Sequence, residues 1–157
     1  MTHYIAPYAE EFHDRLVELW LHAVSQTHDF LTEEDIGFYY DMMQNGALRS
    51  MEIWVCLNTE QEPIGFMGLD GSKIEMLFVD PRHHGQGTGT TLIRHAEQLK
   101  GRRLQVDVNE QNPKAHAFYK KYGFVQIGRS ELDGSGKPFP LIHMQLPYPS
   151  DEKGRCS

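Results

Sequence analysis

The stretch "DPRHHGQGTGTTLIRHAEQLK", residues 80–100, decides how the centre of this chain folds. Gly85, Gly87 and Gly89 stand directly before a segment with helical spacing, and the apolar run "KIEMLFV" ends just before Pro81. Because glycine adopts backbone conformations closed to other residues, successive N–H groups can turn inward at the start of the helix. These N–H groups and the helix dipole favour an anion. A tight strand-to-helix turn that binds no ligand is the alternative.

Two common phosphate-binding motifs do not fit this loop. A dinucleotide-binding fingerprint needs glycine three residues after Gly87, where Thr90 stands. A P-loop needs lysine and then serine or threonine after its last glycine, but Gly89 is followed by Thr90. The residues alone therefore predict an anion site and leave the anion open.

The segments around the loop predict helices alternating with strands in the middle of the chain. Helical spacing and capping residues predict helices over 10–25, 32–46, about 87–99 and 112–123. Alternating or continuous apolar runs bounded by turn residues predict strands over 51–58, 62–71, 73–79, 102–108, 124–132 and 139–146. This order indicates a mixed α/β sheet with right-handed crossovers, in which the strands ending at Val79 and near Val108 lie side by side.

Composition limits the possible classes of protein. A chain of 157 residues with 24% charged and 39% hydrophobic residues fits one globular domain, and no apolar stretch approaches the roughly 20 residues of a membrane helix. The N-terminus has no basic start followed by an apolar block, so we expect no secretory signal and a cytoplasmic location. The net charge of −7 argues against nucleic-acid binding and favours a cationic small partner.

Cysteine and histidine usage gives no sign of a disulfide framework or a metal centre. Cys56 lies in an apolar run, which predicts a core residue, and Cys156 is one residue from the end, which predicts a tail thiol. His83, His84, His95 and His116 lack a dense ligand spacing with cysteine or acidic partners, so we expect no metal.

Two segments together resemble the GNAT superfamily of acetyl-CoA-dependent N-acetyltransferases. They are "LFVDPRHHGQGTG", residues 77–89, and "VDVNEQNPKAHAFYKKYGF", residues 106–124, and the resemblance covers most of residues 50–130. It implies an α+β fold with one mixed, mostly antiparallel sheet of about seven strands, splayed at the centre, and about four helices. We expect one acetyltransferase domain over 1–146, a flexible tail over 147–157, and a monomer or homodimer.

The resemblance also implies where acetyl-CoA binds. The family pattern Arg/Gln-x-x-Gly-x-Gly/Ala falls on residues 84–89, so backbone N–H groups of 85–90 are expected to hold the pyrophosphate. The expected residues there are His84, Gly85, Gln86, Gly87, Thr88, Gly89 and Thr90. Because His84 replaces the usual Arg or Gln, we hypothesise a pH-dependent affinity, tested by coenzyme A titration at pH 6 and 8. Backbone groups of Leu77, Phe78 and Val79 are expected to hold the pantetheine arm; a plain buried strand is the alternative.

The second motif implies the residues of the chemistry. Asn112 is suited to cap the helix that begins with Pro113, and the resemblance adds a contact to the cofactor arm. Tyr119, two turns along the same face, is implied to protonate the departing thiolate, although a place in an aromatic core remains possible. For the base that deprotonates the incoming amine, Asp107 is the candidate and Glu75 its rival; either carboxylate could instead be a solvated strand residue.

The acceptor pocket is expected at the junction of the first two helices, "SQTHDFL", residues 25–31. Its candidate substrate-binding residues are Trp20, His28, Asp29 and Phe30, with Phe38, Tyr39 and Tyr40 nearby. Such a mix of aromatic faces and acid accepts a primary ammonium, on a small molecule or a protein; core packing and helix capping are the structural alternative. The predicted reaction is direct attack of the amine on acetyl-CoA in a ternary complex. A non-catalytic sensor of acyl-CoA is the second hypothesis.

Overall fold

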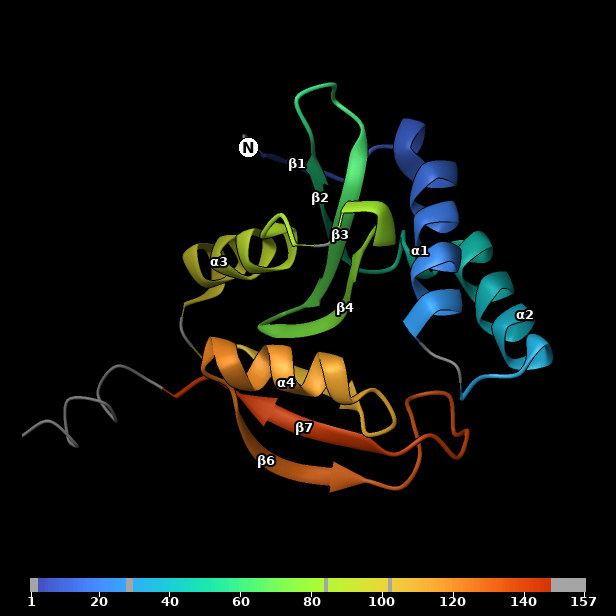
Figure 1. Ribbon diagram of the computed structural model, residues 1–157, viewed down its shortest axis with the longest axis vertical. Helices are drawn as coiled ribbons and strands as arrows, with labels where there is room; N and C mark the ends of the chain where they lie inside the picture. The colour runs from blue at the N-terminus through green and yellow to red at the C-terminus, as the bar shows by residue number, and fades with distance from the viewer. Residues whose placement is uncertain (1–2, 28–29, 84, 102, 148–157) are drawn as a thin grey trace, which may run out of the picture. The chain divides into compact units, whose positions relative to one another are not determined.

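The computed structural model describes residues 3–27, 30–83, 85–101 and 103–147 (Figure 1). The predictions made above for His28, Asp29, His84 and Cys156, and for the tail from residue 148 onward, lie outside the described residues.

Seven strands and four α-helices make up the fold. The strands are β1 (Tyr4–Pro7), β2 (Glu52–Leu57), β3 (Pro63–Asp70), β4 (Lys73–Val79), β5 (Gln105–Asn109), β6 (Val125–Ser130) and β7 (Leu141–Gln145). The helices are α1 (His13–Thr27), α2 (Glu33–Met42), α3 (Thr88–Lys100) and α4 (Pro113–Tyr122). Short 3₁₀ turns occupy Glu10–Phe12 and Pro81–His83, and a π-helical turn at Met43–Ala47 extends α2.

The strands form one sheet in the order β1-β2-β3-β4-β5-β7-β6. The pairs β1–β2, β2–β3, β5–β7 and β6–β7 are antiparallel, whereas β4 and β5 run parallel. The predicted mixed, mostly antiparallel sheet of about seven strands with about four helices is therefore confirmed. The parallel ladder joins Lys73 to Gln105 and Ile74 to Val106, while β4 continues to Val79.

The chain forms two compact units. The first comprises Met1–Asp70 and Glu75–His95, and the second comprises Gly71–Ile74 and Ala96–Ser157. In the first unit, α1 lies beside α2 and packs against β3 (Figure 1). The apolar spacing of α1 buries its inner face in a core shared with β2 and β3, formed by Leu16, Val17, Leu19, Trp20, Val24, Met43, Leu48, Ile53, Val55 and Phe66.

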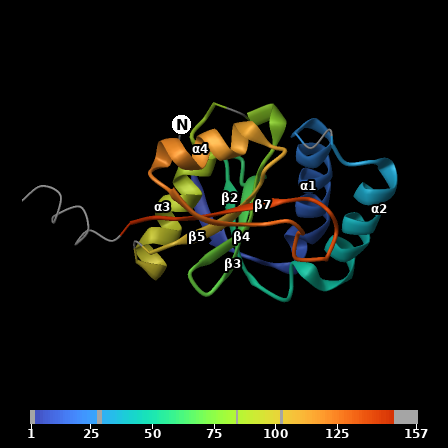
Figure 2. The ribbon, with the colours of Figure 1, turned by 90° about the horizontal axis from the view of Figure 1, so that it is seen from below.

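In the second unit, α4 packs against β5, which pairs with β7 (Figure 2). Val106 lies opposite Met144 and Val108 lies opposite Ile142, and all four side chains are buried. Because side chains alternate along a strand, Asp107 of β5 and its cross-strand neighbour His143 of β7 point to the other face. One face of these strands is thus core, and the other carries a polar pair.

Capping follows the expected sequence signals. Thr32 and Asp35 form a capping box at the start of α2, with the Thr32 hydroxyl accepting from Asp35 N at 3.1 Å. Gly123, with φ of 129°, ends α4, and its N–H donates to carbonyls of that helix. Within the described ranges, no helix has both the length and the apolar character needed to cross a membrane.

Candidate active site

The glycine loop between β4 and α3 uses left-handed backbone conformations at two of its three glycines. Gly85 has φ of 79° and Gly87 has φ of 76°, a region that residues with a side chain rarely adopt, whereas Gly89 lies within α3. Apart from the glycine itself and its chain neighbours, no heavy atom of the described residues lies within 4 Å of where a Cβ would stand at Gly85 or Gly87. Both glycines are exposed, so a ligand can approach this backbone closely.

The first turn of α3 places hydrogen-bonding groups beside these glycines. The Gly87 carbonyl accepts from Thr91 N at 2.9 Å and from Thr91 Oγ1 at 2.8 Å, so regular helical bonding begins at Thr91. The N–H groups of Thr88, Gly89 and Thr90 precede it and have no intrahelical partner. Thr88 is only 2% exposed, and its Oγ1 has no hydrogen-bond partner among the described residues. A buried hydroxyl without a partner fits a site completed by a polar ligand.

Gly65 of β3 allows the start of α3 to sit directly against the sheet. A Cβ at Gly65 would lie 2.7 Å from Thr88 Cγ2 and 3.1 Å from the Phe78 carbonyl oxygen. Only a residue without a side chain permits this approach. Gly65 therefore fixes the height of the loop above the strands, a role that the sequence analysis did not predict.

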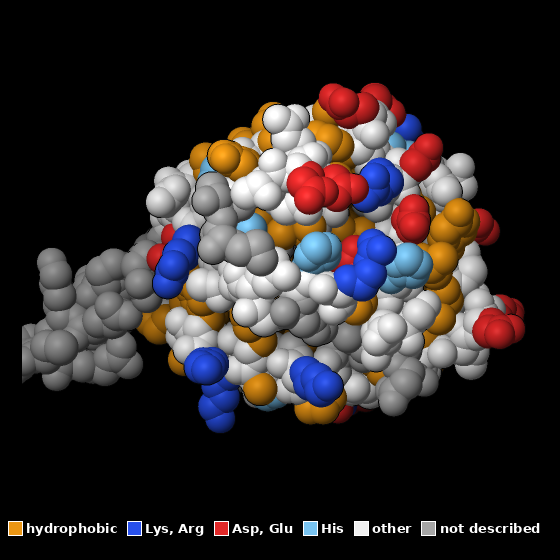
Figure 3. All heavy atoms as spheres, turned by 45° about the horizontal axis from the view of Figure 1, so that its top comes forward, with side chains coloured by type: hydrophobic (Ala, Val, Ile, Leu, Met, Phe, Trp, Pro, Cys, Tyr) orange, Lys and Arg blue, Asp and Glu red, His pale blue; other side chains and the backbone are white. Residues whose placement is uncertain are grey.

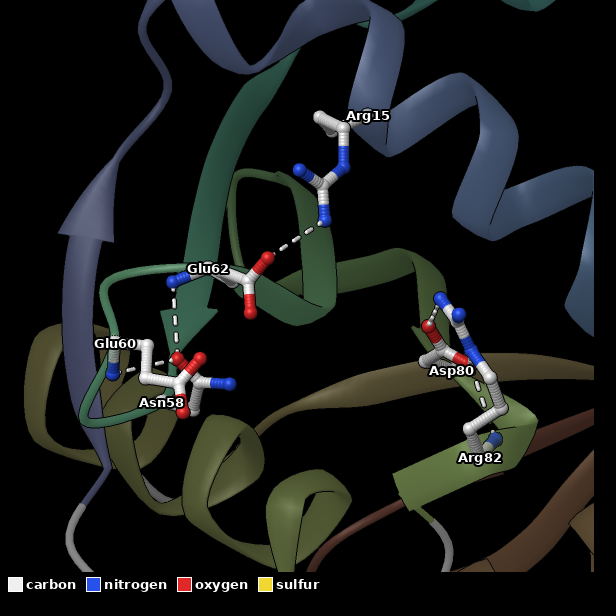
Figure 4. Close-up of polar contacts among 6 residues, drawn as sticks. All are labelled: Arg15, Asn58, Glu60, Glu62, Asp80 and Arg82. Carbon is white, nitrogen blue, oxygen red and sulfur yellow. Dashed lines mark hydrogen bonds and ion pairs between the residues drawn. The ribbon is translucent and has the colours of Figure 1, made fainter.

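Asp80 organises the turn that leads from β4 into the loop (Figure 4). Its carboxylate accepts from Arg82 N at 3.0 Å and Arg82 Nε at 3.1 Å, and forms an ion pair with the guanidinium at 2.7 Å. Its own N–H donates to the Ile64 carbonyl. The hydrogen bonds from Arg82 lower the pKa of the Asp80 carboxyl, although burial opposes this shift. Asp80 thus stays ionised and holds the turn at neutral pH.

The predicted cofactor strand, Leu77–Val79 of β4, is half-buried. The Phe78 ring lies 5.8 Å from the ring of Phe66, and Phe78 packs with Met76 against the core of the first unit. The Phe78 side chain therefore packs against the core, whatever its backbone binds. Glu75, the rival candidate for the base, is exposed on the same strand.

Asn112 is the N-cap of α4, and Tyr119 lies within the last turn of that helix, in the second unit. Asn112 caps the helix through its Oδ1, which accepts from Ala115 N at 3.2 Å. Tyr119 is 6% exposed, and its ring stands edge-on to Phe118 and Phe124 at centroid distances of 5.2 and 5.5 Å. Burial raises the pKa of Tyr119 far above its ordinary value, so its phenol keeps its proton at neutral pH.

Asp107, the candidate base, has both carboxylate oxygens engaged. Oδ2 lies 2.7 Å from Lys73 Nζ, and Oδ1 lies 2.5 Å from His143 Nδ1. Burial alone would raise the pKa of Asp107, but the hydrogen bonds and charges of Lys73 and His143 outweigh it and lower the pKa. A carboxylate held in this way accepts a proton less readily than a free one.

His143 extends this contact into a longer polar chain. Its Nε2 lies 2.6 Å from Ser130 Oγ of β6, so Asp107, His143 and Ser130 are linked across β5, β7 and β6. Ser130 and His143 were not predicted as site residues. Their only signal in the sequence is the alternation that places His143 between the apolar Ile142 and Met144, and this does not name its partners.

The predicted acceptor residues are distributed unevenly. Trp20 is 5% exposed within the core of the first unit, which supports the packing alternative for this side chain. Phe30 is half-buried, and Phe38 is 41% exposed with its ring 5.2 Å from that of Tyr39. Of the acceptor candidates that the structure describes, Phe38 of α2 is the most exposed, whereas Tyr39 and Tyr40 pack against the core.

Basic side chains are dispersed on the face drawn in Figure 3, and metal-ligating side chains do not cluster in the described part of the chain. On the face drawn in Figure 3, acidic and uncharged side chains separate the basic ones, and no continuous basic stripe forms among the described residues. Residues 3–27, 30–83, 85–101 and 103–147 contain no group of three or more His, Cys, Asp or Glu side chains placed to hold a metal ion. Cys56 is buried, as predicted, and is not in a disulfide.

This chain is similar to known acetyltransferases in both sequence and structure. A family model described as an acetyltransferase (GNAT) domain matches residues 27–146. The peptidyl-lysine N-acetyltransferase YjaB of Escherichia coli is 41% identical over 131 residues, covering 83% of this chain and 88% of YjaB. The solution structure of apo-form YjaB superposes with a TM-score of 0.87 at 38% identity, covering 94% of this chain and 99% of that one. A GCN5-related N-acetyltransferase structure from Rhodopseudomonas palustris has a TM-score of 0.79 at 25% identity, with 93% and 96% coverage.

Proposed function

Because this chain belongs to the GNAT family of acetyltransferases, we propose that it transfers an acetyl group from acetyl-CoA to the ε-amino group of lysine in proteins. Membership makes the chain an acyltransferase that uses acetyl-CoA. The acceptor is the proposed part. The lysine acceptor is inferred from the relative named a peptidyl-lysine N-acetyltransferase, which is 41% identical to this chain over 88% of the relative's length. We also propose that residues 1–146 act as one domain in the cytoplasm.

The structural observation that supports acetyl-CoA as the donor is the open backbone of the glycine loop at the start of α3. Gly85 and Gly87 turn in the left-handed region with free space beside them, and the Thr88 hydroxyl is buried with no hydrogen-bond partner among the described residues. Consecutive N–H groups and a hydroxyl of this kind suit the phosphates of coenzyme A. Acetyl-CoA supplies an activated thioester when bound, and this loop contributes affinity and position.

Tyr119 is the proposed general acid. After an amine attacks a thioester, the sulfur departs as an anion and takes a proton, which a positioned phenol can supply. The burial of Tyr119 keeps its phenol protonated at neutral pH, so a proton is available for the departing thiolate. The rings of Phe118 and Phe124 hold the phenol ring in place. Asn112 has the proposed role of contacting the cofactor arm while it caps α4.

A panel of acceptors tests the proposal directly. The full chain is incubated with isotopically labelled acetyl-CoA and with a lysine-containing peptide, the same peptide with arginine in place of lysine, spermidine and an aminoglycoside. We expect mass spectrometry to find the label on the lysine side chain. Label on spermidine or the aminoglycoside alone would replace the protein acceptor by a small amine. Binding of coenzyme A without any transfer would favour the sensor.

The kinetic pattern tests direct attack in a ternary complex. Initial rates are measured over a grid of acetyl-CoA and peptide concentrations. A ternary complex predicts double-reciprocal lines that intersect, whereas a covalent acetyl-enzyme predicts parallel lines and a burst of free thiol without acceptor. Parallel lines would refute direct attack and leave the acetyltransferase activity standing.

A further inference from the structure

The linked side chains Asp107, His143 and Ser130 have the geometry of a proton relay. The distances are 2.5 Å from Asp107 Oδ1 to His143 Nδ1 and 2.6 Å from His143 Nε2 to Ser130 Oγ. All three residues belong to the second unit and come from adjacent strands of the sheet. Neither the capping of α4 nor the position of Tyr119 requires this chain of contacts.

The ionised carboxylate defines the direction of the relay. Asp107 can only accept hydrogen bonds, so the hydrogen between Asp107 and His143 is carried by Nδ1. In a neutral imidazole, Nε2 is then the acceptor and receives the hydroxyl hydrogen of Ser130. A carboxylate that orients an imidazole, which in turn receives a hydroxyl proton, is the arrangement by which proteins build a proton acceptor from histidine.

Groups from three strands contact the His143 ring or its partner carboxylate. From β5 comes Asp107, and from β4 comes Lys73, whose Nζ lies 2.7 Å from the Asp107 carboxylate. From β6 come Ser130 and Gly128, and a Cβ at Gly128 would stand 3.5 Å from His143 Cδ2. The His143 side chain is 29% exposed, so the ring can return a proton to water.

We propose that His143 is the proton acceptor for the incoming amine, with Asp107 as its positioning residue and Ser130 as the hydroxyl that carries the proton. This inference rests on the proposed acetyl transfer. An N–H bond of the ammonium breaks and its proton forms a new O–H bond at Ser130. The original hydroxyl proton of Ser130 moves to His143 Nε2. The positive charge passes from the ammonium to the imidazolium beside Asp107, and the free amine is left to attack.

The relay changes the expected role of Asp107. The lowered pKa of Asp107 makes its carboxylate a weak base. The same shift keeps the carboxylate charged, so it can hold the His143 ring in one orientation. Substitution of Asp107 would therefore act through His143.

The test combines single-turnover rates with the tautomer of His143. With saturating acetyl-CoA and peptide, we expect His143→Ala to slow acetyl transfer by about 10²-fold or more, the usual range for general base catalysis. Added imidazole should restore the rate, and substituted imidazoles should restore it in the order of their basicity. Ser130→Ala should also slow transfer. Ser135→Ala, in the turn before β7, is the matched control and should leave the rate unchanged.

Outcomes that overturn the relay are distinct from those that overturn the activity. If wild-type protein transfers acetyl groups and His143→Ala does so at the same rate, the relay is wrong and the proposed function stands. Rescue that ignores the basicity of the imidazole would mean that His143 only fills space. Nitrogen NMR of the neutral ring should show hydrogen on Nδ1; hydrogen on Nε2 would refute the direction of the relay. Absence of transfer by the wild type refutes the proposed function instead.

Discussion

Replacing Gly87 by alanine should separate the cost to folding from the cost to cofactor binding. Gly87 has φ of 76°, and no atom lies within 4 Å of the position that a Cβ would take. The folding cost is therefore conformational, about 1–2 kcal/mol for a residue with a side chain in the left-handed region. In a chain of this length each kcal/mol lowers Tm by about 2–4 °C, so we expect a loss of roughly 2–8 °C.

The same methyl group would enter the space that the loop leaves open for a ligand. We expect the coenzyme A affinity of Gly87→Ala to fall at least tenfold, which corresponds to about 1.4 kcal/mol. The matched control is Gly71→Ala, in the turn that precedes β4. Gly71 has φ of 61° and the same open space, so its folding cost is similar. The seven-residue strand β4, about 20 Å long, separates that turn from the glycine loop.

Calorimetric titration with coenzyme A, at one salt concentration and below Tm of every variant, gives the comparison. Both variants should lose thermal stability, and Gly87→Ala alone should lose affinity. If the two folded variants bind coenzyme A within twofold of the wild type, the glycine loop does not hold the phosphates. A loss of affinity in Gly71→Ala equal to that in Gly87→Ala would show that reduced stability, and not the loop, controls binding.

Three further predictions concern the loop and the phenol. The pKa of Asp80 is lower in the folded protein, so its pairing with Arg82 stabilises the fold fully above the ordinary aspartate pKa of about 4. This stabilisation is lost as pH falls through the lower pKa of the folded state. In chemical unfolding, the free energy of unfolding should therefore decrease less with acid in Asp80→Asn than in wild type. Gly65→Ala should lose about 1–3 kcal/mol in urea unfolding, because its methyl would meet Thr88 at 2.7 Å; an unchanged midpoint would contradict this close packing. Because burial raises the pKa of Tyr119, the single-turnover rate should show no alkaline decline dependent on this phenol up to about pH 10, the ordinary tyrosine pKa; a decline near pH 8 that vanishes in the phenylalanine variant would refute the burial argument.

The sequence predicted most elements because their apolar spacing is strong and their ends carry clear signals. Thr32 opens α2 and Asn112 opens α4 as predicted, and Gly123 ends α4. The strand β1 was not predicted, because "YIAP" is only four residues long, ends in proline and shows no useful alternation. Its pairing with β2 depends on contacts that are distant in sequence. The predicted family and enzyme class are confirmed.

The candidate site was predictable where it depends on local backbone and not where it depends on strand register. The glycine loop is local, so its left-handed glycines follow from the residues themselves. The contact of Asp107 with His143 joins residues 36 positions apart and requires β5 and β7 to pair in one register. A shift by one residue would place His143 on the other face. The predicted roles of Asp107, Asn112 and Tyr119 stay predictions until they are measured.

The most direct measurement is the single-turnover rate of acetyl transfer to a lysine peptide by Tyr119→Phe, with coenzyme A affinity determined on the same preparation. The substitution keeps the ring between Phe118 and Phe124 and removes only the phenolic hydroxyl. We predict a rate lower by about 10²-fold or more at unchanged affinity and nearly unchanged Tm. A rate equal to that of the wild type would contradict the assignment of Tyr119 as the acid and, with it, the proposed mechanism of this enzyme.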